Sequence, residues 1–261
     1  MSRLTIFSWG YWGWGNATQR LVEVVDAVER DRGFGPPTFV DIRISRSVRA
    51  KGFSGDAFRQ TVGVARYRWM PELGNVSVVE HTAGIRIRKP EAAEDLLEAA
   101  IEALSRNSRV LFYCSCEIPG VRGHSNECHR TTVAHLLLDA ARRQRRSLEV
   151  VEWPGGEPIT IELQVDAHVL GKIRGGLKSV PLHEPFRLGM NGAIPWCSIA
   201  ILRCREQSVP VLTGPARCDS RGWYLPVLKT ASRDTGTIDS LIDEGDRLRR
   251  GCGYAPLSSN L

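Results

Sequence analysis

The stretch SRVLFYCSCEIPGVRGHSNECHRTTVAHLLLDAARRQRRSLEVVEW, residues 108–153, contains the pattern that decides the fold. Residues 108–114 form an apolar run typical of a buried strand. Residues 129–146 carry apolar side chains at helical spacing, and their basic residues gather near the end, where they suit the helix dipole. Residues 147–153 form a further strand-like run before the breaker PGG. Strand, helix and strand in this order predict two parallel strands joined by a crossover helix.

The same alternation extends towards the N-terminus. Strands are predicted over 4–9, 38–44 and 66–70, and helices over 18–30, 54–62 and 89–104. Ser54 is suited to cap one of these helices, and Pro90 is suited to the first turn of another. The predicted fold class is therefore α/β, with a Rossmann-like parallel sheet covered by helices on both faces.

The pattern changes after Pro154. Four β-like runs follow, separated by glycine, proline and polar turns, at 159–171, 196–204, 209–214 and 222–228. Only residues 238–251 have helical spacing there, with Gly251 suited to the C-terminal cap. We therefore predict an α/β domain over 1–155 and a smaller, mainly β accessory domain over 156–261.

The composition is that of an ordinary globular protein. The chain has 261 residues, of which 42% are hydrophobic and 25% are charged. It contains no apolar run of the roughly 18 residues that a membrane span requires, and its N-terminus lacks the features of a secretory signal. We therefore expect a cytoplasmic protein that does not enter a membrane. An odd number of cysteines, seven, indicates reduced thiols or metal ligands in such a chain.

The charge balance permits, but does not require, an anionic partner. The formal net charge is +6, the pI is near 9.1, and most of the basic residues are arginines. An anionic small ligand and a nucleic acid both suit this balance, and so does a merely solvated basic surface. Nothing in the sequence indicates an oligomeric state.

Several short motifs occur in an order that resembles a known family. They are VDIR (40–43), GF (52–53), YRWMPELG (67–74), the strand end at Cys114 and CHR (128–130). Together they resemble the bacterial and archaeal family called domain of unknown function 488, over about residues 4–153. This resemblance implies a compact α/β domain with a Cys-Glu strand end and a Cys-His-Arg helix start, but no particular reaction. The Trp-rich loop GYWGWGN, the long loop between Cys116 and Cys128, and residues 156–261 depart from the family pattern.

The layout also has a weaker similarity to rhodanese-like domains. These domains pair an Asp-x-Arg strand end with a strand, a cysteine loop and a helix. They then have a strand that ends in Gly-Gly, as VVEWPGG (150–156) does here. The similarity implies the same general architecture as the first resemblance.

Candidate site residues follow from the architecture. In a parallel α/β sheet, ligands bind at the carboxyl ends of the strands, near the N-termini of helices. As an enzyme, the protein is predicted to use the catalytic residues Cys128, His129, Arg130, Asp41 and Cys116. The predicted substrate-binding residues are Arg43, Arg46, Trp12, Trp14, Asn16 and Arg122.

The roles of these residues follow from their chemistry. Cys128 just before a helix is suited to a thiolate, which would act as a nucleophile or a ligand. Arg43 and Arg130 would hold anionic oxygens, and Asp41 would orient a partner or act as a base. The spacing of Cys116 and Arg122 also matches that of thiol phosphatases, although arginine is so frequent here that the match arises easily by chance.

A second interpretation makes the same loop a metal site. Cys114, Cys116, His124 and Cys128 provide four ligands of the kinds that tetrahedral zinc prefers. Cys114 and Cys116 can converge only if the strand ends between them, because alternate strand residues otherwise lie on one face but two pleats apart. Zinc is therefore the one cofactor that the sequence suggests.

Ordinary structural roles remain open for the same residues. Cys114 could be a core thiol, Asp41 and Arg43 could form a pair that fastens neighbouring loops, and the aromatic residues 9–14 could cover the core. The first functional hypothesis is an enzyme, a cysteine-dependent transferase or hydrolase, acting on an anionic, nucleotide-containing or nucleic-acid substrate. The alternative is a non-catalytic nucleic-acid-binding protein with a structural metal in the 114–129 loop.

Overall fold

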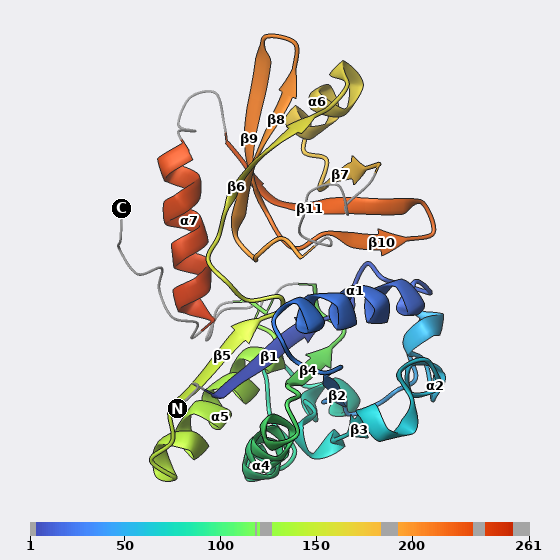
Figure 1. Cartoon of the computed structure of the whole chain (residues 1–261), viewed down its shortest axis with the longest axis vertical. Helices are drawn as coiled ribbons and strands as arrows, with labels where there is room; N and C mark the ends of the chain where they lie inside the picture. Colours follow the sequence, from blue (N-terminus) through green and yellow to red (C-terminus); the bar gives the residue numbers. More distant parts are fainter. Residues whose placement is uncertain (1–3, 118, 121–126, 184–192, 232–237, 253–261) are drawn as a thin grey trace. The chain divides into compact units, whose positions relative to one another are not determined.

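The computed structural model describes residues 4–117, 119–120, 127–183, 193–231 and 238–252 (Figure 1). The chain divides into two compact units. Unit 1 comprises Met1–Trp153 with Gly251–Ala255, and unit 2 comprises Pro154–Arg250 with Pro256–Leu261. In the described part of the chain, no helix is long and apolar enough to span a membrane.

Unit 1 is built on a five-stranded sheet in which every pairing is parallel. Its strands are β1 (Leu4–Gly10), β2 (Thr38–Asp41), β3 (Tyr67–Trp69), β4 (Val110–Cys114) and β5 (Leu148–Glu152), in the spatial order β3-β2-β4-β1-β5. The predicted α/β class with a parallel sheet is confirmed. Because all five strands point the same way, their carboxyl ends form one edge of the sheet.

Helices cover both faces of this sheet. They are α1 (Thr18–Asp31), α2 (Ala57–Val62), α3 (Ser77–Glu80), α4 (Ala92–Ser105) and α5 (His129–Arg143). Helices α4 and α5 lie on one face, and α1 and α2 lie on the other (Figure 1). Leu97 and Leu137 of α4 and α5 belong to one core cluster with Ile6 and Phe112 of the strands.

The opposite face of the sheet has an aromatic core. Phe58 packs edge to face against Phe39 and against Tyr113, with ring centroids 5.2 Å and 5.4 Å apart respectively. Phe53 stacks on Tyr11 with 4.2 Å between the ring centroids. Strand residues alternate between these two cores, so Cys114 faces α4 and α5 while its neighbour Tyr113 faces the aromatic side.

Strand β2 ends at Asp41, earlier than the predicted strand over 38–44. The backbone N–H of Arg43 donates to Oδ1 of Asp41 at 3.1 Å, which turns the chain away from the sheet. The two charged residues that interrupt the apolar run therefore mark the end of the strand.

Unit 2 is mainly β, as predicted for the second half of the chain. Its strands are β6 (Thr160–Gln164), β7 (Ser179–Leu182), β8 (Ser198–Cys204), β9 (Gln207–Thr213), β10 (Arg217–Asp219) and β11 (Gly222–Thr230). They form a curled sheet in the order β10-β11-β9-β8-β6, with β7 paired to β11. Among the described strands of this unit, β6 and β8 pair in parallel and the other pairings are antiparallel.

The described part of unit 2 also contains the helices α6 (Ala167–Arg174) and α7 (Ile238–Gly251). Helix α7 was predicted. In the run 159–171, the β prediction is confirmed for β6 but wrong from Ala167 onwards, where α6 begins. The side chain of Asp166 accepts a hydrogen bond from the N–H of Val169 at 2.7 Å and begins the helix. This capping contact ends the strand-like part of the run and outweighs its apolar alternation.

Candidate functional site

Strand ends from across the sheet meet at the carboxyl edge of unit 1. The parallel register places Gly10, the last residue of β1, beside Cys114, the last residue of β4. In the same way, Asp41 at the end of β2 lies beside Tyr113. Most of the residues predicted from the sequence to form a site lie on this edge, in the strand ends or in the loops that follow them.

Three cysteines converge at this edge. Cys114 ends β4, Cys116 follows two residues later, and Cys128 is the N-cap of α5. Their sulfur atoms all lie within 4.8 Å of one another. The sulfurs of Cys114 and Cys128 are 3.2 Å apart, although 14 residues separate them in the sequence. The strand does end at Cys114, which is the condition under which Cys114 and Cys116 can converge.

The surroundings shift the pKa values of the three thiols in different directions. Hydrogen bonds from Cys114 and Cys116 lower the pKa of Cys128 well below its usual value, although burial opposes this shift. Burial raises the pKa of Cys114 well above its usual value. A hydrogen bond with Cys114 lowers the pKa of Cys116, but its bond to Cys128 and its burial outweigh this and raise it to about 11. The cluster therefore favours one thiolate, at Cys128, with two thiols that donate to it.

The N-terminus of α5 adds to the stabilisation of that thiolate. The backbone N–H of Arg130 donates to the sulfur of Cys128 at 3.5 Å. The positive end of the helix and the guanidinium of Arg130 favour negative charge on the sulfur. Only 3% of Cys128 is exposed, so this stabilisation acts in a largely water-free environment.

A buried ion pair holds the cysteine loop in place. Arg130 is completely buried, and its Nη1 donates to both carboxylate oxygens of Glu152 at 2.6 and 2.8 Å. Its Nη2 donates to the carbonyl oxygen of Cys116 at 3.2 Å. The hydroxyl of Ser8 also donates to Glu152 at 2.8 Å. Arg130 therefore links the end of β5 to the loop that carries Cys116.

Gly10 makes this arrangement possible because it has no side chain. A Cβ atom placed on Gly10 would lie 1.7 Å from the carbonyl oxygen of Cys116 and 2.9 Å from Nη2 of Arg130. The chain after β4 therefore crosses directly over the end of β1. Any other residue at position 10 would push the cysteine loop away from the edge.

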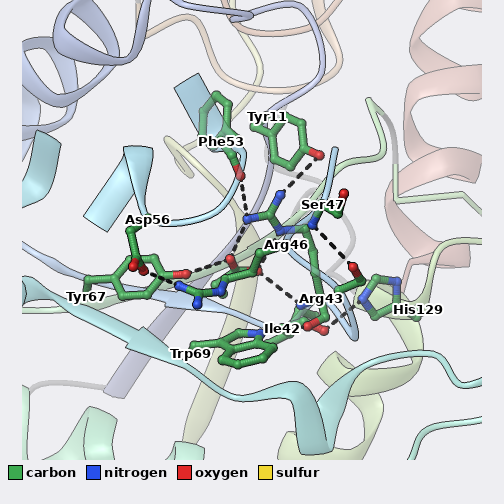
Figure 2. Close-up of polar contacts among 12 residues, drawn as sticks. Tyr11, Ile42, Arg43, Arg46, Ser47, Phe53, Asp56, Tyr67, Trp69 and His129 are labelled. Atoms are coloured by element: carbon green, nitrogen blue, oxygen red, sulfur yellow. Dashed lines mark hydrogen bonds and ion pairs between the residues drawn. The ribbon is translucent and has the colours of Figure 1, made fainter. Parts of the chain in front are cut away.

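A second polar network lies at the end of β2 (Figure 2). Arg43 and Asp41 are both buried, and the guanidinium donates to the two carboxylate oxygens at 2.8 and 2.5 Å. Arg43 also donates to the carbonyl oxygen of Phe53 at 3.0 Å and to the hydroxyl of Tyr11 at 3.3 Å. Tyr67 donates to Oδ2 of Asp41 at 2.8 Å, the oxygen that also accepts from Nη2 of Arg43. These contacts are what a pair that fastens neighbouring loops requires.

The remaining polar residues predicted for the site lie around this network. Nη1 of Arg46 donates to Asp56 at 2.6 Å, and the guanidinium carbon lies 4.4 Å from the ring centroid of Trp69. Nε2 of His129 donates to the carbonyl oxygen of Ile42 at 3.3 Å, which connects α5 with the loop after β2 (Figure 2).

The aromatic loop after β1 divides between core and surface. Trp12 is 53% exposed and Asn16 is also exposed, so both remain accessible to a ligand. Trp14 is 1% exposed and lies in the core, which leaves no face of its ring for the substrate-binding role predicted for it. Arg122 and His124, predicted to bind substrate and metal respectively, lie outside the described residues.

Four further residues of the edge were not predicted from the sequence. Ser8, Gly10 and Glu152 support the cysteine loop, and Tyr67 completes the contacts of Asp41. The signal for Glu152 was present, because an acidic residue at the end of an apolar strand needs a buried partner. No local pattern identifies Ser8 or Gly10, whose roles depend on the contact between β1 and the cysteine loop.

Comparison with protein-family models, curated proteins and solved structures finds no match to this chain. Three sulfur donors grouped within 4.8 Å can hold a metal ion. Bonds of about 2.3 Å to a tetrahedral zinc ion place the sulfurs about 3.8 Å apart, so the observed spacing suits a single thiophilic ion.

Proposed function

We propose that the carboxyl edge of unit 1 is a zinc site formed by Cys114, Cys116 and Cys128. The observation that carries this proposal is the convergence of three thiols within 4.8 Å, from two segments of the chain. Thiolates are the ligands that zinc prefers, and the helix N-terminus of α5 favours the negative charge that three thiolates bring. The buried Arg130–Glu152 pair fixes the cysteine loop and is neutral as a pair, so it does not compete with the ion.

The fourth position of a tetrahedral ion is the part of the site that decides its role. A fourth protein ligand gives a closed, structural site, and His124 is the sequence's candidate for it. A water molecule or a substrate in that position gives an open, catalytic site. The first case agrees with the metal-stapled nucleic-acid-binding protein, and the second agrees with an enzyme acting on an anionic substrate.

Elemental analysis of the full-length protein tests the metal site. Protein produced with added zinc and purified under reducing conditions is expected to hold about one zinc per chain. Cys128→Ser is expected to lose the ion, while Cys204→Ser, a half-buried thiol of unit 2, is expected to keep it. Zinc that is absent from the wild type, or retained equally by both variants, would contradict the proposal.

Cobalt substitution then distinguishes a closed site from an open one. Thiolate-bound cobalt has a charge-transfer band, and its visible bands change when a ligand enters the fourth position. Added cyanide or a thiol is expected to alter the spectrum of an open site and to leave that of a closed site unchanged. Replacing His124 by Ala is expected to alter the cobalt spectrum only if His124 is the fourth ligand.

A second candidate function is supported by the environment of Cys128 itself. A thiolate at a helix N-terminus, with a lowered pKa, is also the arrangement of a nucleophilic cysteine in a transferase or hydrolase. Its burial argues against direct attack on a large substrate. Metal-free wild type whose Cys128 reacts with iodoacetamide at neutral pH much faster than Cys204 would favour this candidate.

The resemblance to the domain of unknown function 488 family remains part of the proposal. It is supported by where the matching residues lie. Residues 40–43, 52–53 and 67–74 surround the Asp41–Arg43 network, while Cys114 and 128–130 form the thiol cluster. Motifs that meet at one edge of the sheet are consistent with a shared site. The rhodanese-like similarity has only the parallel α/β layout in its support.

A further inference from the structure

The exposed ring of Trp69 at the carboxyl end of β3 is held unusually firmly for a surface aromatic residue. Trp69 is 41% exposed, yet its indole N–H donates to the carbonyl oxygen of Arg43 at 2.9 Å. The guanidinium of Arg46 covers one face of the ring at 4.4 Å from its centroid (Figure 2). The remaining exposed surface is therefore a flat, fixed ring, which loses little conformational entropy when another planar group stacks on it.

The two arginines that hold this ring are themselves held by carboxylates. Arg46 forms an ion pair with Asp56 at 2.6 Å. Arg43, whose backbone carbonyl oxygen accepts the indole N–H, belongs to the buried network of Asp41. The cation on one face of Trp69 also makes the ring system better suited to contact with an electron-rich base. The geometry is thus set before any ligand arrives.

The chain beside Trp69 is strongly basic. Residues 46–59 contain four cationic side chains and one carboxylate, Asp56, which contacts Arg46 and Arg59. Arg49 and Lys51 are exposed, and no carboxylate in the described part of the chain lies within ion-pair distance of either. Their charges are therefore available to phosphate groups.

A second exposed aromatic residue lies on the loop that this basic segment contacts. A Cβ atom placed on Gly52 would lie 2.7 Å from the carbonyl oxygen of Gly15 and 3.3 Å from the Cα of Asn16. The segment therefore packs against the loop that carries Trp12, which is 53% exposed. Two exposed indole rings and two unpaired cations thus belong to adjoining segments of one edge.

We propose that this surface, formed by Trp12, Arg46, Arg49, Lys51 and Trp69, binds single-stranded nucleic acid. Exposed aromatic rings offer stacking to unpaired bases, and the cations contact the backbone phosphates. A duplex does not present its base faces to such rings, and a single nucleotide engages only one of them. This inference goes beyond the zinc site and does not depend on it, because none of the five residues is a proposed metal ligand.

Fluorescence anisotropy with a labelled 12-nucleotide single strand tests the proposal with the full-length protein. Binding is expected at low salt and is expected to weaken steeply as salt is added. Trp69→Ala is expected to weaken binding about tenfold, since a stacked base contributes roughly 1–3 kcal/mol, and Trp69→Phe is expected to retain most of the affinity. Val78→Ala, which shortens another exposed apolar side chain of unit 1, is the matched control and is expected to change nothing.

The charge contribution is tested by a double variant with a matched double control. The plot of log K against log salt has a negative slope. Arg49→Gln with Lys51→Gln is expected to make this slope shallower by about 1.4, the value for two phosphate contacts on a single strand. Arg145→Gln with Arg146→Gln makes the same charge change at two exposed arginines just after α5, at the opposite edge of the sheet, and is expected to leave the slope unchanged.

Three results would overturn the proposal. They are equal affinity of wild type and Trp69→Ala, equal or tighter binding of a duplex, and binding of a mononucleotide as tight as that of the 12-mer. Zinc content is measured on every variant. A surface variant that loses nucleic-acid binding but keeps about one zinc per chain shows that this surface is separate from the metal site. Cys128→Ser is expected to give the reverse result, which is loss of zinc with nucleic-acid binding retained.

Discussion

Among single residues, Asp41 shows how the carboxyl edge of unit 1 holds a buried charge. Asp41 accepts from Arg43 and Tyr67, and these contacts neutralise a carboxylate that would otherwise be costly to bury. Burial and the neighbouring Asp41 raise the pKa of Tyr67 to about 12. The neutral phenol is thus the form that the folded protein stabilises.

The raised pKa of Tyr67 predicts how stability depends on pH. The ordinary pKa is 10.0, so the contribution of the neutral phenol is fully present below about pH 10 and is lost as the pH rises through about 12. Tyr67→Phe is expected to make the alkaline decrease in the free energy of unfolding shallower. At neutral pH the variant is expected to be less stable by about 1–2 kcal/mol, because Asp41 loses a donor.

Urea unfolding at about pH 7, 9 and 10.5 measures both effects. The neutral-pH measurement isolates the lost hydrogen bond, because the phenol is then protonated in the folded and unfolded states alike. A slope between pH 9 and 10.5 that is as steep in Tyr67→Phe as in the wild type would show that Tyr67 does not contribute to it.

At the scale of elements, the cysteine cluster is produced by the junction of β1, β4, β5 and α5. Strand β4 supplies Cys114, α5 supplies Cys128 at its N-cap, and Gly10 of β1 leaves room for the chain that carries Cys116. The ion pair between Arg130 of α5 and Glu152 of β5 joins the remaining two elements of this junction. The cluster is therefore a property of how these elements join and not of any one of them.

The buried pair at this junction predicts a large effect of a single substitution. Arg130→Met leaves Glu152 buried without its cation and frees the carbonyl oxygen of Cys116, so it is expected to lower the free energy of unfolding by about 3–5 kcal/mol. Arg143→Met removes the same kind of side chain from the same helix, where its pair with Glu94 is exposed. Its expected cost is less than about 1 kcal/mol.

Urea unfolding of the two variants under reducing conditions makes the comparison. The double variant Arg130→Met with Glu152→Met is expected to recover part of the lost stability, because it removes the unpaired carboxylate. Similar losses in Arg130→Met and Arg143→Met would contradict the role assigned to the buried pair.

At the scale of the whole molecule, the thiol cluster belongs to one of two compact units. All three cysteines lie in unit 1, and each unit has its own sheet and its own apolar core. A ligand that binds only the folded form of unit 1 stabilises that unit by mass action. Its removal is therefore expected to act on one part of the chain.

Zinc removal is expected to destabilise unit 1 selectively. At free zinc about 100-fold above the dissociation constant, the ion would contribute about 2.7 kcal/mol to the stability of the form that binds it. Hydrogen exchange measured by mass spectrometry, with and without a chelator, is expected to show faster exchange in β4 and α5 and unchanged exchange in β8 and β9. Uniform acceleration across both units, or none in β4 and α5, would contradict the assignment.

Local sequence patterns were enough to predict the helices and strands of unit 1 and the edge of the sheet at which the candidate residues lie. Apolar periodicity is a local property, so the helices and strands of unit 1 could be located from it, apart from the short α3 and the early end of β2. The location of Cys114, Cys128 and Asp41 at one edge followed from the parallel order of the strands. The early capping of α6 by Asp166 was overlooked because an alternating apolar run also suits a strand.

Which side chains meet and which are accessible could be learned only from the three-dimensional structure. It joined Arg130 with Glu152, Arg43 with Asp41, and the three thiols with one another, and it buried Trp14 while leaving Trp12 and Trp69 exposed. These outcomes depend on strand register and on the path of loops, which are set by packing between residues far apart in the chain. A sequence motif records that a cysteine or an arginine is present, but the partner that neutralises its charge or shares its proton is supplied by another strand.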